Sequence, residues 1–191
     1  MHSDLDKQLV SNYPKIFRDR LAPMTDTAMC WGFEHGDGWF HPLNQACFLI
    51  QRHIDSSRSD RARILRYNRA LKRAFSGDVS ALERYYAGKG PVNDWCRKTA
   101  AQDAATGNFR AVPNDCPQVV ATQVKEKFGT LRFYYYGGDE YVQGVENMLA
   151  AMSEVTCEVC SRPGTLFAQG WVVCRCPECR AQEQGQGARV A

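Results

Sequence analysis

No run of apolar residues in this sequence approaches the ~18 residues that a membrane-spanning helix needs. The first residues do not combine a basic start with an apolar stretch, so no signal peptide is expected. The sequence also lacks the glycine pattern of a phosphate-binding loop and any recognised hydrolase or nuclease motif. These absences predict a protein without a membrane segment and give no support for an enzyme of those classes.

The charge and composition exclude little more. The 191 residues carry a formal net charge of +3, which is too small to imply nucleic-acid binding by itself. Hydrophobic residues make up 44% and charged residues 24%, as in ordinary globular proteins. The nine cysteines are an odd number, and at least four of them have the spacing of metal ligands. The composition therefore predicts a globular protein of a reducing cytoplasm and not a secreted disulfide scaffold.

Two C-x₂-C pairs lie near the C-terminus, Cys157 with Cys160 and Cys176 with Cys179. Each pair places two sulfurs on one tight turn, and four such thiolates are the ligand set of a structural zinc site. We therefore predict one Zn²⁺ in a zinc ribbon over residues 154–180, with a short hairpin between the pairs. Four protein ligands leave no position for water, so a catalytic role is not expected. Cys174 is predicted to stay outside the metal shell.

The periodicity of apolar residues predicts an α+β fold. Helical spacing is found in three main segments: about 42–53, 60–75 and 140–154. In the first of these the apolar positions are Leu43, Ala46, Cys47, Ile50 and Ile54. A polar break is expected at 55–59, and strands are expected over 118–128 and 130–136. The predicted architecture is N-terminal helices packed on a small antiparallel sheet, then a helix that leads into the zinc ribbon. The polar tail 181–191 is predicted to be disordered.

The strongest concentration of charge lies in residues 51–75, which contain eight Lys or Arg and two Asp, a net charge of +6. Arg66, Arg69 and Arg73 recur at i, i+3 and i+7 and share one face of the predicted helix. Such a face can bind phosphates or an acidic protein surface, or it can be a solvated face with no partner. We take these three arginines as the candidate partner-binding residues.

A loop rich in glycine and aromatic residues contains Glu34, His35 and Asp37. These residues could be metal ligands or a general acid and base. A tight Gly-Asp-Gly turn needs the same residue types for backbone reasons alone. No catalytic residue is therefore predicted here, and a metal-dependent enzyme stays an alternative.

Three segments carry a resemblance to known proteins: Met29–Phe33 with Gly36–Trp39, Gln123–Tyr135 with Gly137–Asp139, and the Cys157/Cys160 turn. In this order they resemble a family of small, uncharacterised bacteriophage and prophage proteins. The resemblance covers about 10–50 and 118–180, and it implies a phage origin without implying an activity. The segment 52–117 does not match this family. It is expected to be a variable, mostly helical region, a candidate insertion in an α+β core over 1–153.

These observations predict a non-enzymatic, phage-encoded zinc-binding protein that binds a macromolecule in the cytoplasm of a bacterial host, with counter-defence as one such role. A host protein is the expected partner. The first alternative is a nucleic-acid-binding protein that uses the zinc ribbon and the basic helix 60–75. The second is a metal-dependent enzyme that uses Glu34, His35 and Asp37.

Overall fold

The chain forms two compact units in the computed structural model, which describes residues 1–187. Unit 1 comprises Met1–Ile54 together with the chain from Cys116 onward, and unit 2 comprises Asp55–Asp115. Helices and two small sheets make the fold α+β, which confirms the predicted class. Among the described residues, no helix is both long and apolar enough to cross a membrane.

A three-stranded mixed sheet lies in unit 1. Strands β2 (Val120–Lys127) and β3 (Thr130–Tyr136) form the antiparallel hairpin that the sequence predicts. Strand β1 (Phe33–Glu34) pairs with β2 in parallel. The sheet is therefore mixed, whereas a purely antiparallel sheet was predicted. Two residues are too few to show the alternation by which a strand is recognised in a sequence.

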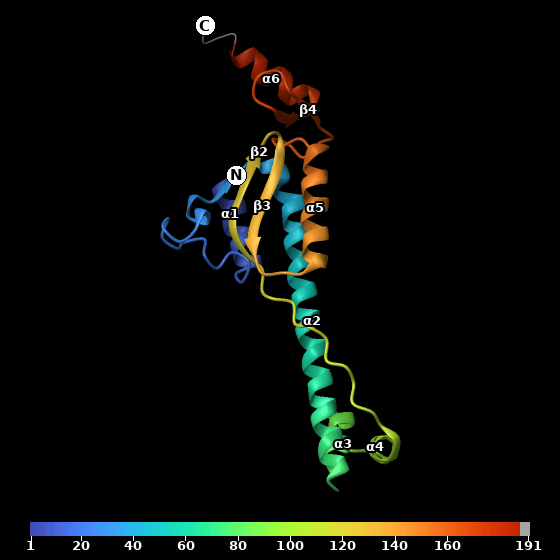
Figure 1. Ribbon diagram of the computed structural model, residues 1–191. Helices are drawn as coiled ribbons and strands as arrows, with labels where there is room; N and C mark the ends of the chain where they lie inside the picture. Colours follow the sequence, from blue (N-terminus) through green and yellow to red (C-terminus); the bar gives the residue numbers. More distant parts are fainter. Residues whose placement is uncertain (188–191) are drawn as a thin grey trace. The chain divides into compact units, whose positions relative to one another are not determined.

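Three helices pack with this sheet around one apolar core (Figure 1). They are α1 (Ser3–Asn12), the first part of α2 (Phe40–Phe75) and α5 (Glu140–Glu154). The apolar positions predicted for the start of α2 are all buried: Leu43, Ala46, Cys47, Ile50 and Ile54. They meet Val124, Leu131 and Phe133 of the sheet in the same cluster. The short 3₁₀ helices Ala28–Trp31 and Asp37–Trp39 flank β1 and complete the loop before α2.

Helix α2 runs without interruption from Phe40 to Phe75, so the predicted break at 55–59 was wrong. That stretch is polar but contains neither glycine nor proline. Serine and aspartate cost a helix less than ~1 kcal/mol each relative to alanine, and this is not enough to end it. The polar residues of this stretch therefore indicate a solvent-exposed part of the helix and not its end.

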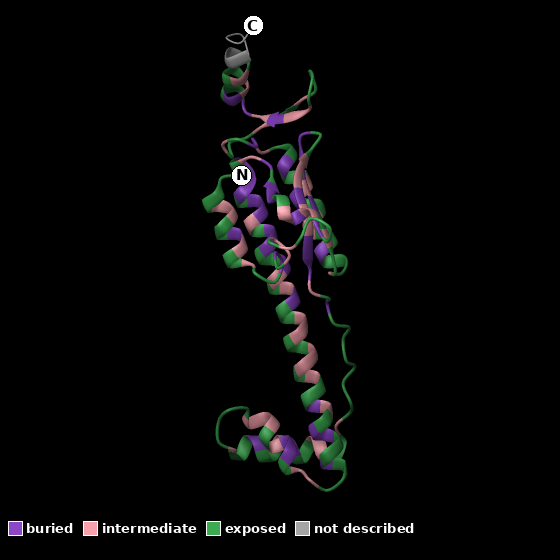
Figure 2. Cartoon of the chain, turned by 90° about the vertical axis from the view of Figure 1, so that its left-hand side faces the viewer, coloured by how far each residue is buried: buried purple, intermediate pink, exposed green. Residues whose placement is uncertain are grey.

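Unit 2 contains the rest of α2 with α3 (Ser80–Ala87) and α4 (Asp94–Thr106). Figure 2 shows the buried positions of this unit among many exposed ones. Its small core consists of Tyr67, Ala70, Leu71, Ala74, Ala81, Leu82 and Ala100. Asp103 accepts hydrogen bonds from the hydroxyls of Tyr67 and Tyr86 and so links the three helices. Unit 2 falls inside the segment 52–117 that the sequence sets apart; its status as an insertion stays a prediction.

The C-terminal part of unit 1 consists of an antiparallel hairpin followed by a helix. Strand β4 (Thr165–Phe167) pairs with β5 (Val173–Arg175), and α6 (Pro177–Gly187) follows directly. Residues 181–187 are thus helical where disorder was expected, and proline in the first turn is typical of a helix start. The remaining residues of that prediction, 188–191, lie outside the described residues.

Candidate metal centre

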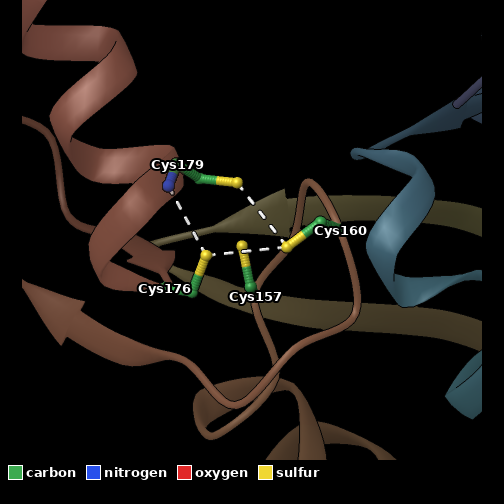
Figure 3. A group of neighbouring side chains, drawn as sticks. All are labelled: Cys157, Cys160, Cys176 and Cys179. Atoms are coloured by element: carbon green, nitrogen blue, oxygen red, sulfur yellow. Dashed lines mark hydrogen bonds between the residues drawn. The ribbon is translucent and has the colours of Figure 1, made fainter.

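Four cysteine side chains from two separate segments meet at the C-terminal end of unit 1. Cys157 and Cys160 lie on the turn that follows α5, Cys176 lies between β5 and α6, and Cys179 lies in the first turn of α6. Figure 3 shows their sulfurs turned toward one another, and all four lie within 4.8 Å of each other. The two C-x₂-C pairs therefore form one cluster, as their spacing predicts.

The distances within the cluster fit a metal ion. The Cys160 sulfur lies 3.6 Å from the Cys176 sulfur and 3.6 Å from the Cys179 sulfur. In a tetrahedral site with metal–sulfur distances of ~2.3 Å, neighbouring sulfurs lie ~3.8 Å apart. Cys157, Cys176 and Cys179 are buried, and Cys160 is partly exposed. The four thiols could hold a metal ion with little rearrangement.

A neighbouring arginine favours the ionised form of one of the four thiols. Arg162 Nε donates to the Cys160 sulfur at 3.3 Å, and this hydrogen bond lowers the pKa of Cys160 to about 6. The thiolate is the form that binds metals. Arg162 also pairs with Glu178 at 3.0 Å, so it connects the Cys157–Cys160 turn to the start of α6.

Cys174 lies outside this cluster. Its side chain is fully buried, belongs to the apolar core of unit 1 and donates to the Glu154 carbonyl at 3.3 Å. Burial raises the pKa of this thiol to about 11. Cys174 is therefore a packing residue that joins β5 to the end of α5.

The Cys157–Cys160 turn is hydrogen-bonded to the loop that precedes α2. The Gly38 amide donates to the Glu158 carbonyl at 2.7 Å, and the Gly36 amide donates to the Glu158 carboxylate at 2.9 Å. Trp39 Nε1 donates to the Thr156 carbonyl at 2.8 Å, and Ser161 Oγ donates to the Gly38 carbonyl at 2.8 Å. The Cys157–Cys160 turn is thus attached to the core of unit 1 by hydrogen bonds from both backbone and side chains.

Glycine is required at two positions of this contact because the two backbones come so close. A Cβ atom at Gly38 would lie 2.1 Å from the Cys157 carbonyl oxygen, and one at Gly36 would lie 2.4 Å from the Glu158 carbonyl oxygen. Both contacts are with backbone, which cannot turn aside as a flexible side chain can. The Gly-Asp-Gly sequence therefore serves the approach of the cysteine turn.

Glu158 connects this loop to the hairpin as well. Its second carboxylate oxygen pairs with Arg175 Nη1 at 2.7 Å, and both side chains are nearly buried. Arg175 Nε also pairs with Glu183 at 2.6 Å. Sequence reasoning missed Glu158 and Arg175. The C-x₂-C spacing admits any residue at Glu158, it does not extend to Arg175, and it gives no sign that the two side chains pair.

Two residues of the alternative enzyme site are hydrogen-bonded to other segments of the chain. Glu34 accepts a hydrogen bond from Gln123 at 3.0 Å, and Asp37 accepts one from the His2 amide at 2.6 Å. His35 is buried, with Nδ1 2.8 Å from the Gly36 carbonyl and Nε2 without a partner. Within residues 1–187, these three side chains form no group that could hold a metal ion. The hydrogen bonds of Glu34 and Asp37 attach this loop to β2 and to the N-terminal segment.

Burial of His35 gives a testable pH dependence. Burial is the main cause that lowers the pKa of His35 to about 4 from its usual 6.5. Between these values the unfolded chain binds a proton that the folded chain does not, so stability falls as the pH falls from 6.5 toward 4. We expect wild-type protein to lose about 2 kcal/mol more than a His35→Leu variant between pH 7 and pH 5 in urea unfolding. The four clustered thiols are present in both proteins, so they cannot cause a difference between them. Equal losses of stability in the wild type and in His35→Leu would therefore contradict the assignment to His35.

A fourth arginine lies beside the three predicted partner-binding arginines. Arg66, Arg69 and Arg73 are exposed on α2, and with Arg84 of α3 they line a shallow hollow of about 250 Å³ beside Tyr85. We call these four arginines the basic cluster. Among residues 1–187, Arg66 and Arg69 make no ion pair, whereas Arg73 and Arg84 share Asp78. Arg84 is absent from the sequence prediction because it lies on a different helix.

No protein-family model, curated protein or solved structure matches this chain. The bacteriophage origin therefore stays a prediction. The candidate sites are supported by their geometry and chemistry alone.

Proposed function

We propose that the four thiols hold one Zn²⁺ and that this ion has a structural role. Four sulfur donors at tetrahedral spacing suit zinc, which has no redox chemistry of its own and binds thiolates well. The ligand set is complete without water, so the ion would polarise no substrate. Its effect would be to hold β4, β5 and α6 on the Gly36–Trp39 loop.

The protein itself is proposed to be a non-enzymatic binding protein that recognises an acidic surface with its basic cluster. The observation that carries this proposal is the charge distribution. Unit 2 contains twelve Lys or Arg against seven Asp or Glu, a net charge of +5, while the whole chain carries +3. Two of the four clustered arginines have no acidic partner within residues 1–187. Arginine is suited to this role because its guanidinium binds carboxylates with two parallel hydrogen bonds.

A protein partner is favoured over a nucleic acid by the other exposed side chains of unit 2. Phe75, Trp95 and Phe109 are each more than half exposed. Exposed aromatic residues together with arginine are typical of the parts of protein–protein interfaces that contribute most to binding. The alternative, binding of nucleic acid, rests on the same cluster of positive charge.

The proposed location is the reducing cytoplasm of a bacterial host. None of the nine cysteines forms a disulfide in the structure. Free thiols in this number are typical of a reducing compartment. The assignment to a bacterial host follows from the resemblance to phage proteins.

A charge-reversal experiment tests the binding role. We expect Arg66→Glu/Arg69→Glu to weaken binding to the acidic partner at least ~10-fold, which corresponds to about 1.4 kcal/mol. Both residues are exposed, so circular dichroism should show a normal fold. The matched control is Arg97→Glu/Lys98→Glu, which makes the same change in charge on α4 of the same unit and should leave affinity within about twofold.

The partner for this measurement is obtained by pull-down from a bacterial lysate, with and without nuclease, and identified by mass spectrometry. Capture that survives nuclease, belongs to an acidic protein and is lost only with the first variant supports the proposal. Capture abolished by nuclease would establish the nucleic-acid alternative. Equal loss in both variants would show that only net charge matters and would contradict a defined cluster.

A further inference from the structure

A second group of possible metal ligands lies within unit 1, on residues other than the four clustered cysteines. His53 is on α2, Cys116 is in the segment before β2, and Asp139 immediately precedes α5. One ligand atom from each lies within 4.8 Å of the other two. We propose that these three side chains form a second zinc site, with three protein ligands and one position open to solvent.

The donor set is suited to zinc. Imidazole nitrogen, thiolate sulfur and carboxylate oxygen are the three ligand types that zinc takes in proteins. A mixed set with a thiolate and an imidazole also disfavours magnesium and calcium, which prefer oxygen ligands alone. Three protein ligands are fewer than a structural site uses, so water would complete the tetrahedron.

Neighbouring groups hold the ligands in place. The His53 ring stacks on the Tyr141 ring with centroids 4.2 Å apart and an angle of 22° between the planes. Asp139 Oδ1 accepts a hydrogen bond from the Val142 amide at 3.2 Å, as the N-cap of α5. Its other oxygen, Oδ2, lies 2.7 Å from His53 Nε2. The contacts from Tyr141 and Val142 lie outside the ligand set, and outer contacts of this kind orient metal ligands and raise affinity.

The three proposed ligands differ in how far they are exposed to solvent. Cys116 is 2% exposed, whereas the side chains of His53 and Asp139 are 28% and 39% exposed. A bound ion would therefore be coordinated from the protein interior by the Cys116 thiolate, and its side nearest Asp139 would face solvent. This site should exchange its metal faster than the closed four-thiol cluster does.

The same three groups could instead form only a hydrogen-bonded network around the His53–Asp139 pair. Metal stoichiometry distinguishes the two arrangements. We expect native mass spectrometry of zinc-saturated, buffer-exchanged protein to show two zinc ions in the wild type. Cys116→Ser and Asp139→Asn should each show one, and Cys157→Ser should show one. Asparagine caps a helix as well as aspartate does, so Asp139→Asn should keep α5 intact.

The matched control is Cys47→Ala, which removes a buried thiol of the same unit that belongs to neither group of ligands. This variant should retain two zinc ions. A weak chelator should remove one ion from the wild type at least tenfold faster than the other, and this fast phase should be absent in Cys116→Ser. A single zinc ion in the wild type, unchanged in Cys116→Ser and Asp139→Asn, would overturn the second site and leave the network.

Discussion

Replacing Cys157 with serine is expected to release one zinc ion and to detach the C-terminal hairpin and α6 from unit 1. Structural zinc contributes on the order of 10 kcal/mol to the folding of very small domains. Residues 156–184 have few other buried apolar groups, since their own cluster consists of the cysteines alone. Hydrogen exchange should therefore show loss of protection in β4 and β5 and at the amides of Gly36 and Gly38, which donate to Glu158. Protection in β2, β3 and α5 should remain.

Cys174→Ser is the control for this experiment. The serine hydroxyl can still donate to the Glu154 carbonyl, and the four-thiol cluster is untouched. This variant should keep the zinc ion and the protection of β4, β5, Gly36 and Gly38. Zinc lost from Cys174→Ser but retained by a Cys176→Ser variant would contradict the assigned ligand set.

Gly38→Ala is expected to destabilise unit 1 by about 3 kcal/mol although it adds one methyl group. The added Cβ would meet the Cys157 carbonyl oxygen at 2.1 Å and the Glu158 carbonyl oxygen at 2.6 Å. Relief of this clash must separate the two backbones and break the 2.7 Å hydrogen bond from the Gly38 amide. Urea unfolding of the zinc-saturated protein measures the effect.

Gly144→Ala is the matched substitution for that test. Gly144 lies inside α5, and a Cβ there would meet no atom within 4 Å. Alanine is favoured over glycine inside a helix by roughly 0.5–1 kcal/mol, so this variant should be slightly stabilised. Equal stability of Gly38→Ala and Gly144→Ala would show that the cysteine turn does not approach the loop as closely as described.

Features encoded locally in the sequence could be predicted. The spacing of the four cysteines predicted that they cluster, because a C-x₂-C turn brings its sulfurs together whatever surrounds it. The buried positions of α2 between Leu43 and Ile54 followed from helical periodicity. The β2–β3 hairpin followed from alternation on both sides of a glycine turn.

Features that depend on distant segments could not be predicted. His53 is 63 residues before Cys116 and 86 before Asp139, so no local spacing joins these residues. The Gly-Asp-Gly loop suggested chemistry because its partner, the Cys157–Cys160 turn, lies more than a hundred residues further along the chain. Arg84 joined the basic cluster only through the packing of α3 on α2. In each case the missing information was a tertiary contact.

X-ray absorption at the zinc edge is the most direct test of the four-thiol zinc site. The measurement is best made on the Cys116→Ser variant, in which only that site should hold zinc. We expect four sulfur neighbours at ~2.3 Å and no oxygen or nitrogen neighbour. A zinc ion with oxygen or nitrogen in its first shell, or a purified protein without zinc, would contradict the site on which this account rests.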